Sequence, residues 1–189
     1  MLLTFGATPG RDVGELGDGQ EVVLTERSST LRAHAGQVSF PGGKIDPEDV
    51  DEVGAALREA QEEVGIDPAA VTVVDTLPAL YLHPSQNAVT PVLGWWHEPH
   101  DIGVVDPGEV ARVVRVPLEE VLDPANRFTV TAPRGYRGPG FELHGLFVWG
   151  FTAQLLSTVL DLGGLTRPWD QDRERRLPLR MLRPYLRRG

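Results

Sequence analysis

The sequence predicts an α/β fold of the α+β type, in which a mixed β-sheet carries helices on both faces. Short apolar runs bounded by glycine, proline and aspartate recur along the chain, as in strands joined by turns. One longer segment has apolar residues three and four apart, which is typical of a helix that packs one face on a sheet. The strands and helices do not alternate in the repeating βαβ order of a doubly wound fold.

The first strands are expected at residues 1–6, 21–25 and 36–40, with a Gly- and Asp-rich surface loop between the first two. The third strand ends at Pro41-Gly42-Gly43, which predicts a tight turn with accessible backbone carbonyls. A chain that starts inside a strand is consistent with the loss of a few N-terminal residues. We expect residues 1–189 to form a single domain, because this length is typical of one domain.

A helix is predicted over residues 47–64. Asp46 is suited to cap it, Pro47 to its first position, and Gly65 to its end. Its apolar positions follow the helical spacing and should face the core: Val53, Ala56, Leu57, Ala60 and Val64. Further strands are expected at 71–77, 88–96 and 109–117, a short helix at 118–123, and a strand at 141–150 that leads into a helix over 152–162.

Charge and composition exclude several classes of function. The formal net charge of −9 argues against a surface for nucleic acid or anionic membrane, because both need basic patches. The Arg-rich C-terminal extension, 167–189, is the exception, and we interpret it as a solvated polar tail. There is no cysteine, the most apolar stretch (143–160) is broken by polar residues and glycine, and no secretory leader is visible. These features predict a cytoplasmic protein.

Three glutamates lie within one and a half turns of the predicted helix. Residues three and four positions apart lie on the same side of a helix, so the side chains of Glu59, Glu62 and Glu63 point in nearly the same direction. They form either a solvated acidic face or a site for a hard cation. Arg58 is placed to pair with Glu62 one turn later, which leaves Glu59 and Glu63 free. Carboxylates of this kind are suitable ligands for Mg²⁺ together with waters and substrate phosphates.

The segment 42–66, GGKIDPEDVDEVGAALREAQEEVGI, resembles the signature of the Nudix hydrolases. The second half of that signature is matched without a gap by Arg58, Glu59, Glu62, Glu63, Gly65 and Ile66. The first half departs from it: Gly43 and Arg58 are fifteen positions apart instead of fourteen, and Val50 stands where the family has a glutamate. Asp46 or Asp49 is then expected to orient the loop. The resemblance implies a Nudix-like α/β/α sandwich.

A second segment, 23–43, resembles the additional motif of the coenzyme A pyrophosphatase branch of that family. The sequence VLTERSSTLRAHAGQVSFPGG matches it at Thr25, Arg27, Ser28, Arg32, Gly36, Phe40, Pro41, Gly42 and Gly43, while Val23 replaces a leucine. This second resemblance implies hydrolysis of the diphosphate of coenzyme A or its thioesters, which gives 3′,5′-ADP and 4′-phosphopantetheine or its acyl derivative.

The resemblance also implies a cofactor and roles for particular residues. Mg²⁺ or Mn²⁺ would be held by Glu59, Glu62, Glu63 and a carbonyl of Gly42 or Gly43. Glu59 is the first candidate for the general base and Glu63 the second, with Arg58 as a further catalytic residue. Glu109 is a candidate loop carboxylate for metal or water, although a capping or solvated role is an equal alternative for it.

Four residues are candidates for substrate binding: Arg27, Arg32, Lys44 and Phe40. Arginine offers paired donors to phosphate, but each of these side chains also has a structural alternative, namely a surface ion pair, a solvated lysine or a core aromatic. The substrate alternatives are ADP-ribose, NADH or a nucleoside triphosphate. Two hypotheses without catalysis also stay open: a catalytically inactive domain that binds a nucleotide as a sensor, and a structural domain whose acidic helix binds no metal. We expect a monomer or homodimer.

Overall fold

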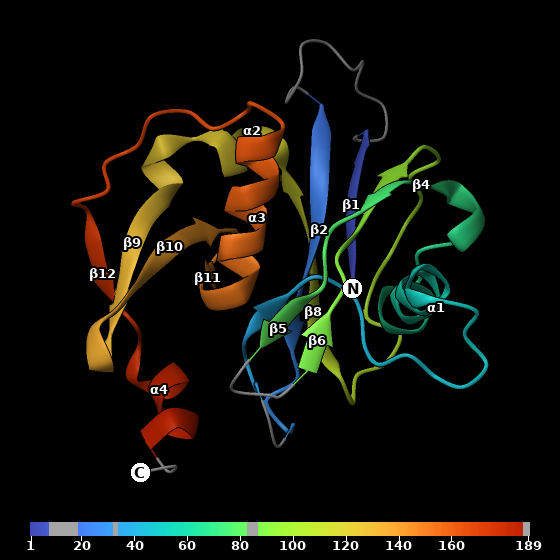
Figure 1. The fold of residues 1–189 in the computed structure, drawn as a ribbon, viewed down its shortest axis with the longest axis horizontal. Coiled ribbons are helices and arrows are strands. Elements are labelled where there is room, and N and C mark those ends of the chain that lie inside the picture. Colours follow the sequence, from blue (N-terminus) through green and yellow to red (C-terminus); the bar gives the residue numbers. More distant parts are fainter. Residues whose placement is uncertain (8–18, 32–33, 83–86, 187–189) are drawn as a thin grey trace.

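The computed structural model describes residues 1–7, 19–31, 34–82 and 87–186, and its centre is a six-stranded mixed sheet (Figure 1). The strand order is β3-β2-β1-β7-β4, and β8 pairs with β2. β1 and β7 run parallel, whereas the other pairs in this sheet are antiparallel. The strands are β1 (Leu2–Ala7), β2 (Gln20–Arg27), β3 (Val38–Ser39), β4 (Val71–Thr76), β7 (Val92–Trp96) and β8 (Val110–Pro117).

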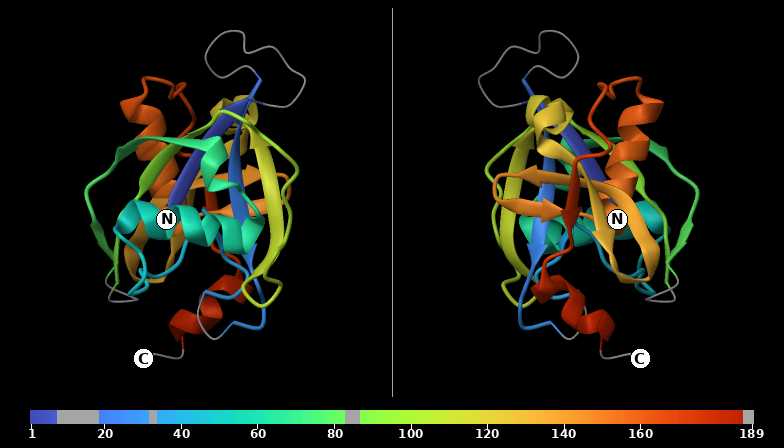
Figure 2. Two further views of the ribbon diagram at one scale, coloured as in Figure 1. Left: turned by 90° about the vertical axis from the view of Figure 1, so that its right-hand side faces the viewer. Right: turned by 90° about the vertical axis from the view of Figure 1, so that its left-hand side faces the viewer.

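Helix α1 (Glu52–Val64) covers one face of this sheet (Figures 1 and 2). Its buried residues Ala56, Ala60 and Val64 pack against Val23 and Trp96, in a core cluster that Val53 and Leu57 border. The predicted apolar face is therefore confirmed. A 3₁₀ turn (Pro68–Ala70) links the helix to β4.

The opposite face of the sheet is covered by α3 (Gly150–Leu162) and α2 (Leu118–Leu122). Leu3, Val22 and Leu24 of the sheet pack there against Leu156 of α3 and Phe141. Alternate residues of β1 and β2 thus point to opposite cores, as a strand buried on both faces requires. The predicted mixed sheet with helices on both faces is confirmed.

A second sheet of four strands, in the order β11-β10-β9-β12, extends the core beyond α3 (Figure 1). Its strands are β9 (Arg127–Ala132), β10 (Tyr136–Leu143), β11 (Leu146–Val148) and β12 (Glu174–Arg176), with 3₁₀ turns at Pro124–Asn126 and Pro133–Gly135. Helix α4 (Leu179–Leu186) follows, and a small core joins Phe128 and Val130 to Leu177 and Met181. A separate hairpin is formed by β5 (Leu80–Leu82) and β6 (Asn87–Val89).

The structure corrects the predicted start of the first helix. Asp51, not Asp46, is the N-cap, and its carboxylate accepts a hydrogen bond of 2.8 Å from the Gly54 amide. The acidic residues before it, which would also suit a first helical turn, lie in the loop, where Asp49 is held by Arg58. Gly65 ends the helix in the left-handed conformation with φ of 81°, as predicted.

Three other expectations were wrong. The strand expected at 88–96 is divided, since β6 ends at Val89 and β7 begins at Val92. The single strand expected at 141–150 is a hairpin, reversed at His144 and Gly145, which both have positive φ. The C-terminal extension is not merely a solvated tail, because β12 pairs with β9 and two side chains beyond it are buried. No helix in the described ranges is long and apolar enough to cross a membrane.

Candidate active site

A cleft of about 1050 Å³ runs between the turn after β3, the β5–β6 hairpin and the β9–β10 turn. Gly42, Gly43 and Arg27 line it on the side of α1, and Arg134 and Trp149 line it on the side of the second sheet. Phosphate-sized and nucleotide-sized ligands bind in cavities of this scale. The predicted glycine turn is therefore at the wall of a ligand-sized cleft.

Glu63 is the most deeply buried acid of α1, with 3% of its surface exposed. Its Oε2 accepts a hydrogen bond of 2.9 Å from the Gly42 amide, and its Oε1 lies 3.9 Å from Nη1 of Arg27. Burial raises the pKa of the Glu63 carboxyl to about 7, against the lowering effects of that amide and of Arg27. Negative charge on Glu59 and Glu109 raises the pKa further.

Glu59 lies one turn earlier, directly beneath Gly43. A Cβ atom placed on Gly43 would fall within the Glu59 carboxylate, so a larger residue at this position would force the Glu59 side chain to move. Burial is the main cause that raises the pKa of Glu59, and Glu62 and Glu109 add to it, whereas Arg58 lowers it. A second carboxylate of the stripe is thus held close to the backbone of the glycine turn.

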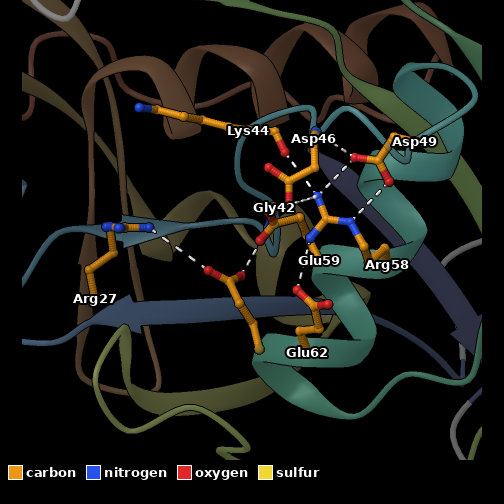
Figure 3. Close-up of polar contacts among 9 residues, drawn as sticks. Arg27, Gly42, Lys44, Asp46, Asp49, Arg58, Glu59 and Glu62 are labelled. Atoms are coloured by element: carbon orange, nitrogen blue, oxygen red, sulfur yellow. Dashed lines mark hydrogen bonds and ion pairs between the residues drawn. The ribbon is translucent and has the colours of Figure 1, made fainter.

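Arg58 connects the loop to the helix through contacts with five groups (Figure 3). Its Nε and Nη2 donate to the two oxygens of Asp49, each at 2.9 Å, and Nη2 also donates to the Lys44 carbonyl at 3.0 Å. Nη1 donates to Glu62 at 2.8 Å, which confirms the predicted pair. Nη2 also lies 3.2 Å from Oε1 of Glu59, so the expectation that Arg58 leaves Glu59 free was wrong. Of the two acids expected to orient the loop, Asp49 makes the paired hydrogen bonds, while Asp46 lies 3.6 Å away.

Arg27 at the end of β2 connects the upstream motif to the helix. It lies 3.9 Å from Glu63 and 3.7 Å from Oε2 of Glu109, so it sits between the two carboxylates. The Ser28 amide donates to the Glu109 carbonyl at 2.7 Å, which fixes the loop that carries Glu109 beside β2. The structure therefore brings Arg27, Glu63 and Glu109 together.

The other predicted substrate residues are placed differently. Arg32 lies outside the described residues. Lys44 lines the cleft with an exposed side chain, and its carbonyl is the group that Arg58 binds. Phe40 also borders the cleft but is 1% exposed within the sheet core, so it shapes the wall and presents almost no ring surface to a ligand.

Comparison with known proteins identifies the family. The model of the NUDIX domain matches residues 11–134, well over half of the chain. The chain belongs to the Nudix family. Nudix hydrolase 15, mitochondrial, of Arabidopsis thaliana is 38% identical over 153 residues, which cover 76% of this chain and 52% of that protein. The uncharacterized Nudix hydrolase NudL of Cronobacter sakazakii is 41% identical over 146 residues, or 71% of each chain.

The chain thus spans about half the length of the Arabidopsis relative and 71% of the length of the bacterial relative. Among solved structures, a Nudix hydrolase from M. smegmatis, RenU, superposes with a TM-score of 0.56 over 90% of this chain and 87% of its own, at 18% identity. This similarity confirms the predicted Nudix fold, including parts of the chain beyond residue 134.

Nudix hydrolases generally use divalent cations such as Mg²⁺ or Mn²⁺, and the carboxylates here fit that need only in part. Within the described ranges, no three acids or histidines are close enough together to form a complete set of ligands. Arg58 holds two of the three glutamates, because Nη1 donates to Glu62 and Nη2 lies 3.2 Å from Glu59. The buried carboxylate of Glu63 and the half-buried one of Glu59 fit a half-site that substrate oxygens and water would complete.

Sequence reasoning missed the wall of the cleft that faces α1. Arg134, Arg137, Trp149 and Leu177 belong to the second sheet, the start of α3 and the C-terminal segment, and nothing in the Nudix signature refers to them. The role of Asp49 could have been assigned by counting forward from Gly43: it lies six positions on, where the family has its glutamate. The extra residue of the signature therefore falls between Asp49 and Arg58.

Proposed function

We propose that this Nudix protein hydrolyses the diphosphate linkage of coenzyme A or its thioesters, with Mg²⁺ or Mn²⁺. The observation that supports this is the position of Arg27. This arginine belongs to the segment that resembles the coenzyme A branch, and it lies 3.9 Å from Glu63 of the Nudix helix. Arg27, Gly42 and Gly43 line one cleft, whereas Glu59 and Glu63 contact the glycine turn and do not line the cleft themselves. A diphosphate bound at this turn would therefore lie beside the features of both segments.

The reaction adds water across a phosphoanhydride. The water oxygen forms a bond to one phosphorus atom as the bond from that atom to the bridging oxygen breaks, and the products are 3′,5′-ADP and 4′-phosphopantetheine or its acyl form. A bound divalent cation would neutralise the diphosphate and lower the pKa of a water. Glu59 and Glu63, with a carbonyl of the Gly42-Gly43 turn, would hold that cation.

The chain's own side chains supply the remaining steps of this proposal. Arg27 would orient the diphosphate through paired donors, aided by Lys44 at the rim of the cleft. Both oxygens of Glu63 have partners, since Oε2 accepts from the Gly42 amide and Oε1 lies 3.9 Å from Arg27. On Glu59 the described contact is that of Oε1 with Arg58 at 3.2 Å, and its side chain is 16% exposed against 4% for Glu63, so Glu59 is the better acceptor for the proton of the water. Glu109 is the second acid within reach of Arg27.

Product analysis tests the proposal. The protein is incubated with Mg²⁺ or Mn²⁺ and, separately, with coenzyme A, ADP-ribose, NADH and dATP, with Glu63→Gln as the control variant. We expect 3′,5′-ADP from coenzyme A and none from the variant. Cleavage of another compound alone would keep the Nudix chemistry and refute the substrate. No cleavage of any compound would favour a nucleotide-binding sensor.

A further inference from the structure

The cleft is cationic on both sides although the protein is acidic. The charged side chains that line it in the described part of the chain are Arg27, Lys44, Arg134 and Arg137 against Glu52. The whole protein has a formal net charge of −9, so this excess of arginine and lysine is local. Arg27 at the end of β2 and Lys44 after the glycine turn lie near the Nudix helix, whereas Arg134 and Arg137 belong to the β9–β10 turn and to β10.

Arg134 has an unusual backbone and a side chain without a protein partner. Its φ of 64° is left-handed, and Gly135 follows with φ of 76°, so the turn between β9 and β10 is held in a conformation that disfavours arginine. The side chain is exposed at the cleft and makes no ion pair or hydrogen bond within the described residues. A strained position that presents an unpaired guanidinium to a cleft is typical of a ligand-binding residue.

Arg137 lies close by, but its side chain already has a partner within the protein. Its guanidinium pairs with Glu174 of β12, and both side chains remain about half exposed. The wall around the two arginines is mainly apolar, with Trp149 and Phe151 at the start of α3 and Leu177 and Leu182 from the C-terminal segment. This wall suits the uncharged portion of a long ligand that carries a charge at each end.

We propose that Arg134, assisted by Arg137, forms a second anion subsite at the β9–β10 end of the cleft. It would bind an anionic group that the substrate carries away from the scissile diphosphate. This inference rests on the proposed function, in which two sources share that chemistry: the 3′-phosphate of the nucleotide, and a carboxylate on the acyl chain of a thioester. Guanidinium binds either group through paired charged hydrogen bonds.

The first test measures binding without catalysis. Calorimetric titrations in EDTA compare 3′,5′-ADP with 5′-AMP, which differ by the 3′-phosphate alone. If that phosphate occupies the subsite, the unaltered protein prefers 3′,5′-ADP, and Arg134→Gln reduces the preference about tenfold, as expected for the loss of a charged hydrogen-bonded pair. Arg180→Gln is the matched control, because Arg180 is exposed on α4 and does not line the cleft.

The second test compares kcat/KM for malonyl-CoA with acetyl-CoA, and for coenzyme A with dephospho-coenzyme A. A selective loss in Arg134→Gln for malonyl-CoA assigns the carboxylate, and a selective loss for coenzyme A assigns the phosphate. Glu174→Gln, which releases Arg137, should change the same ratio in the opposite direction. If Arg134→Gln leaves every ratio unchanged, the subsite is refuted.

The failure of the proposed function is a separate result. If the unaltered protein cleaves no coenzyme A species, that function is wrong, and the nucleotide titrations alone decide the subsite. A lost preference for 3′,5′-ADP in Arg134→Gln would then keep the subsite, and equal affinities for the two nucleotides would overturn it.

Discussion

Replacing Glu63 by glutamine should stabilise the metal-free protein while it abolishes hydrolysis. The carboxyl has a pKa of about 7 in the folded chain against an ordinary value of 4.5. Because the folded state favours the protonated acid, ionisation opposes folding once the pH exceeds 4.5, and the cost is complete above pH 7. Glutamine carries no charge and keeps an oxygen that can accept from the Gly42 amide.

The magnitude follows from the two pKa values. Proton linkage gives a cost of roughly 1 kcal/mol at pH 5 and about 3 kcal/mol at pH 8. Glu63→Gln should therefore gain about 2 kcal/mol relative to the unaltered protein between these two pH values. Urea unfolding in EDTA at both pH values measures this difference, and EDTA is needed because a bound cation would favour the ionised carboxylate.

Glu98→Gln provides the control, since Glu98 is an exposed glutamate outside the cleft. It should show no comparable change in stability between pH 5 and pH 8. If Glu63→Gln is equally or less stable than the unaltered protein at pH 8, burial of the ionised carboxylate is not the main effect of Glu63 on the free energy of unfolding. The account of the Glu63 pKa would then be wrong.

Three further predictions concern the turn, the loop and the metal. Gly43→Ala should lower kcat at least a hundredfold, because a Cβ displaces the Glu59 carboxylate. Gly54→Ala on α1 is the control: its Cβ would make only an ordinary contact of 3.6 Å with Asp51, so this variant should keep activity and gain about 0.5–1 kcal/mol of stability, as kinetics and thermal unfolding would show. Asp49→Asn should lower kcat about tenfold, because the amide nitrogen cannot accept from Arg58, so one of the two hydrogen bonds is lost and the other has a neutral acceptor. An unchanged kcat would show that activity does not depend on this contact between the loop and the helix. Mg²⁺ at ten times its Kd should add about 1.4 kcal/mol to the free energy of unfolding, and an equal gain in Glu59→Gln would exclude Glu59 as a ligand.

Local signals predicted the part of the site that lies on one helix. Three glutamates and their arginine occupy a continuous run, so the helical period alone fixes their relative directions, and the pair between Arg58 and Glu62 follows from it. The glycine turn was predicted for a similar reason, because Gly42 and Gly43 can adopt the backbone conformations of a tight turn that other residues disfavour, and Gly42 has a φ of 146°. These features depend on residues close together in the chain.

The features that the sequence did not predict depend on pairing between distant segments. The bond from Gly42 to Glu63 crosses 21 positions, and β12 joins β9 from more than 40 positions away. The start of α1 was missed because Asp46 and Asp51 are equally good caps in isolation, and the contact of Asp49 with Arg58 decides between them. The hairpin at His144 was missed because a histidine with positive φ gives a weak turn signal.

The pairing of β12 with β9 also sets an order of events during synthesis. The residues that match the NUDIX domain end at residue 134, so the glutamates, the glycine turn and the central sheet leave the ribosome well before Leu177 and Leu182. Until those two leucines have been made, the cleft beside the glycine turn lacks part of its apolar wall. Residues that follow β12 therefore complete that wall, and a ligand long enough to touch both sides of the cleft has its full binding surface only after they have packed there.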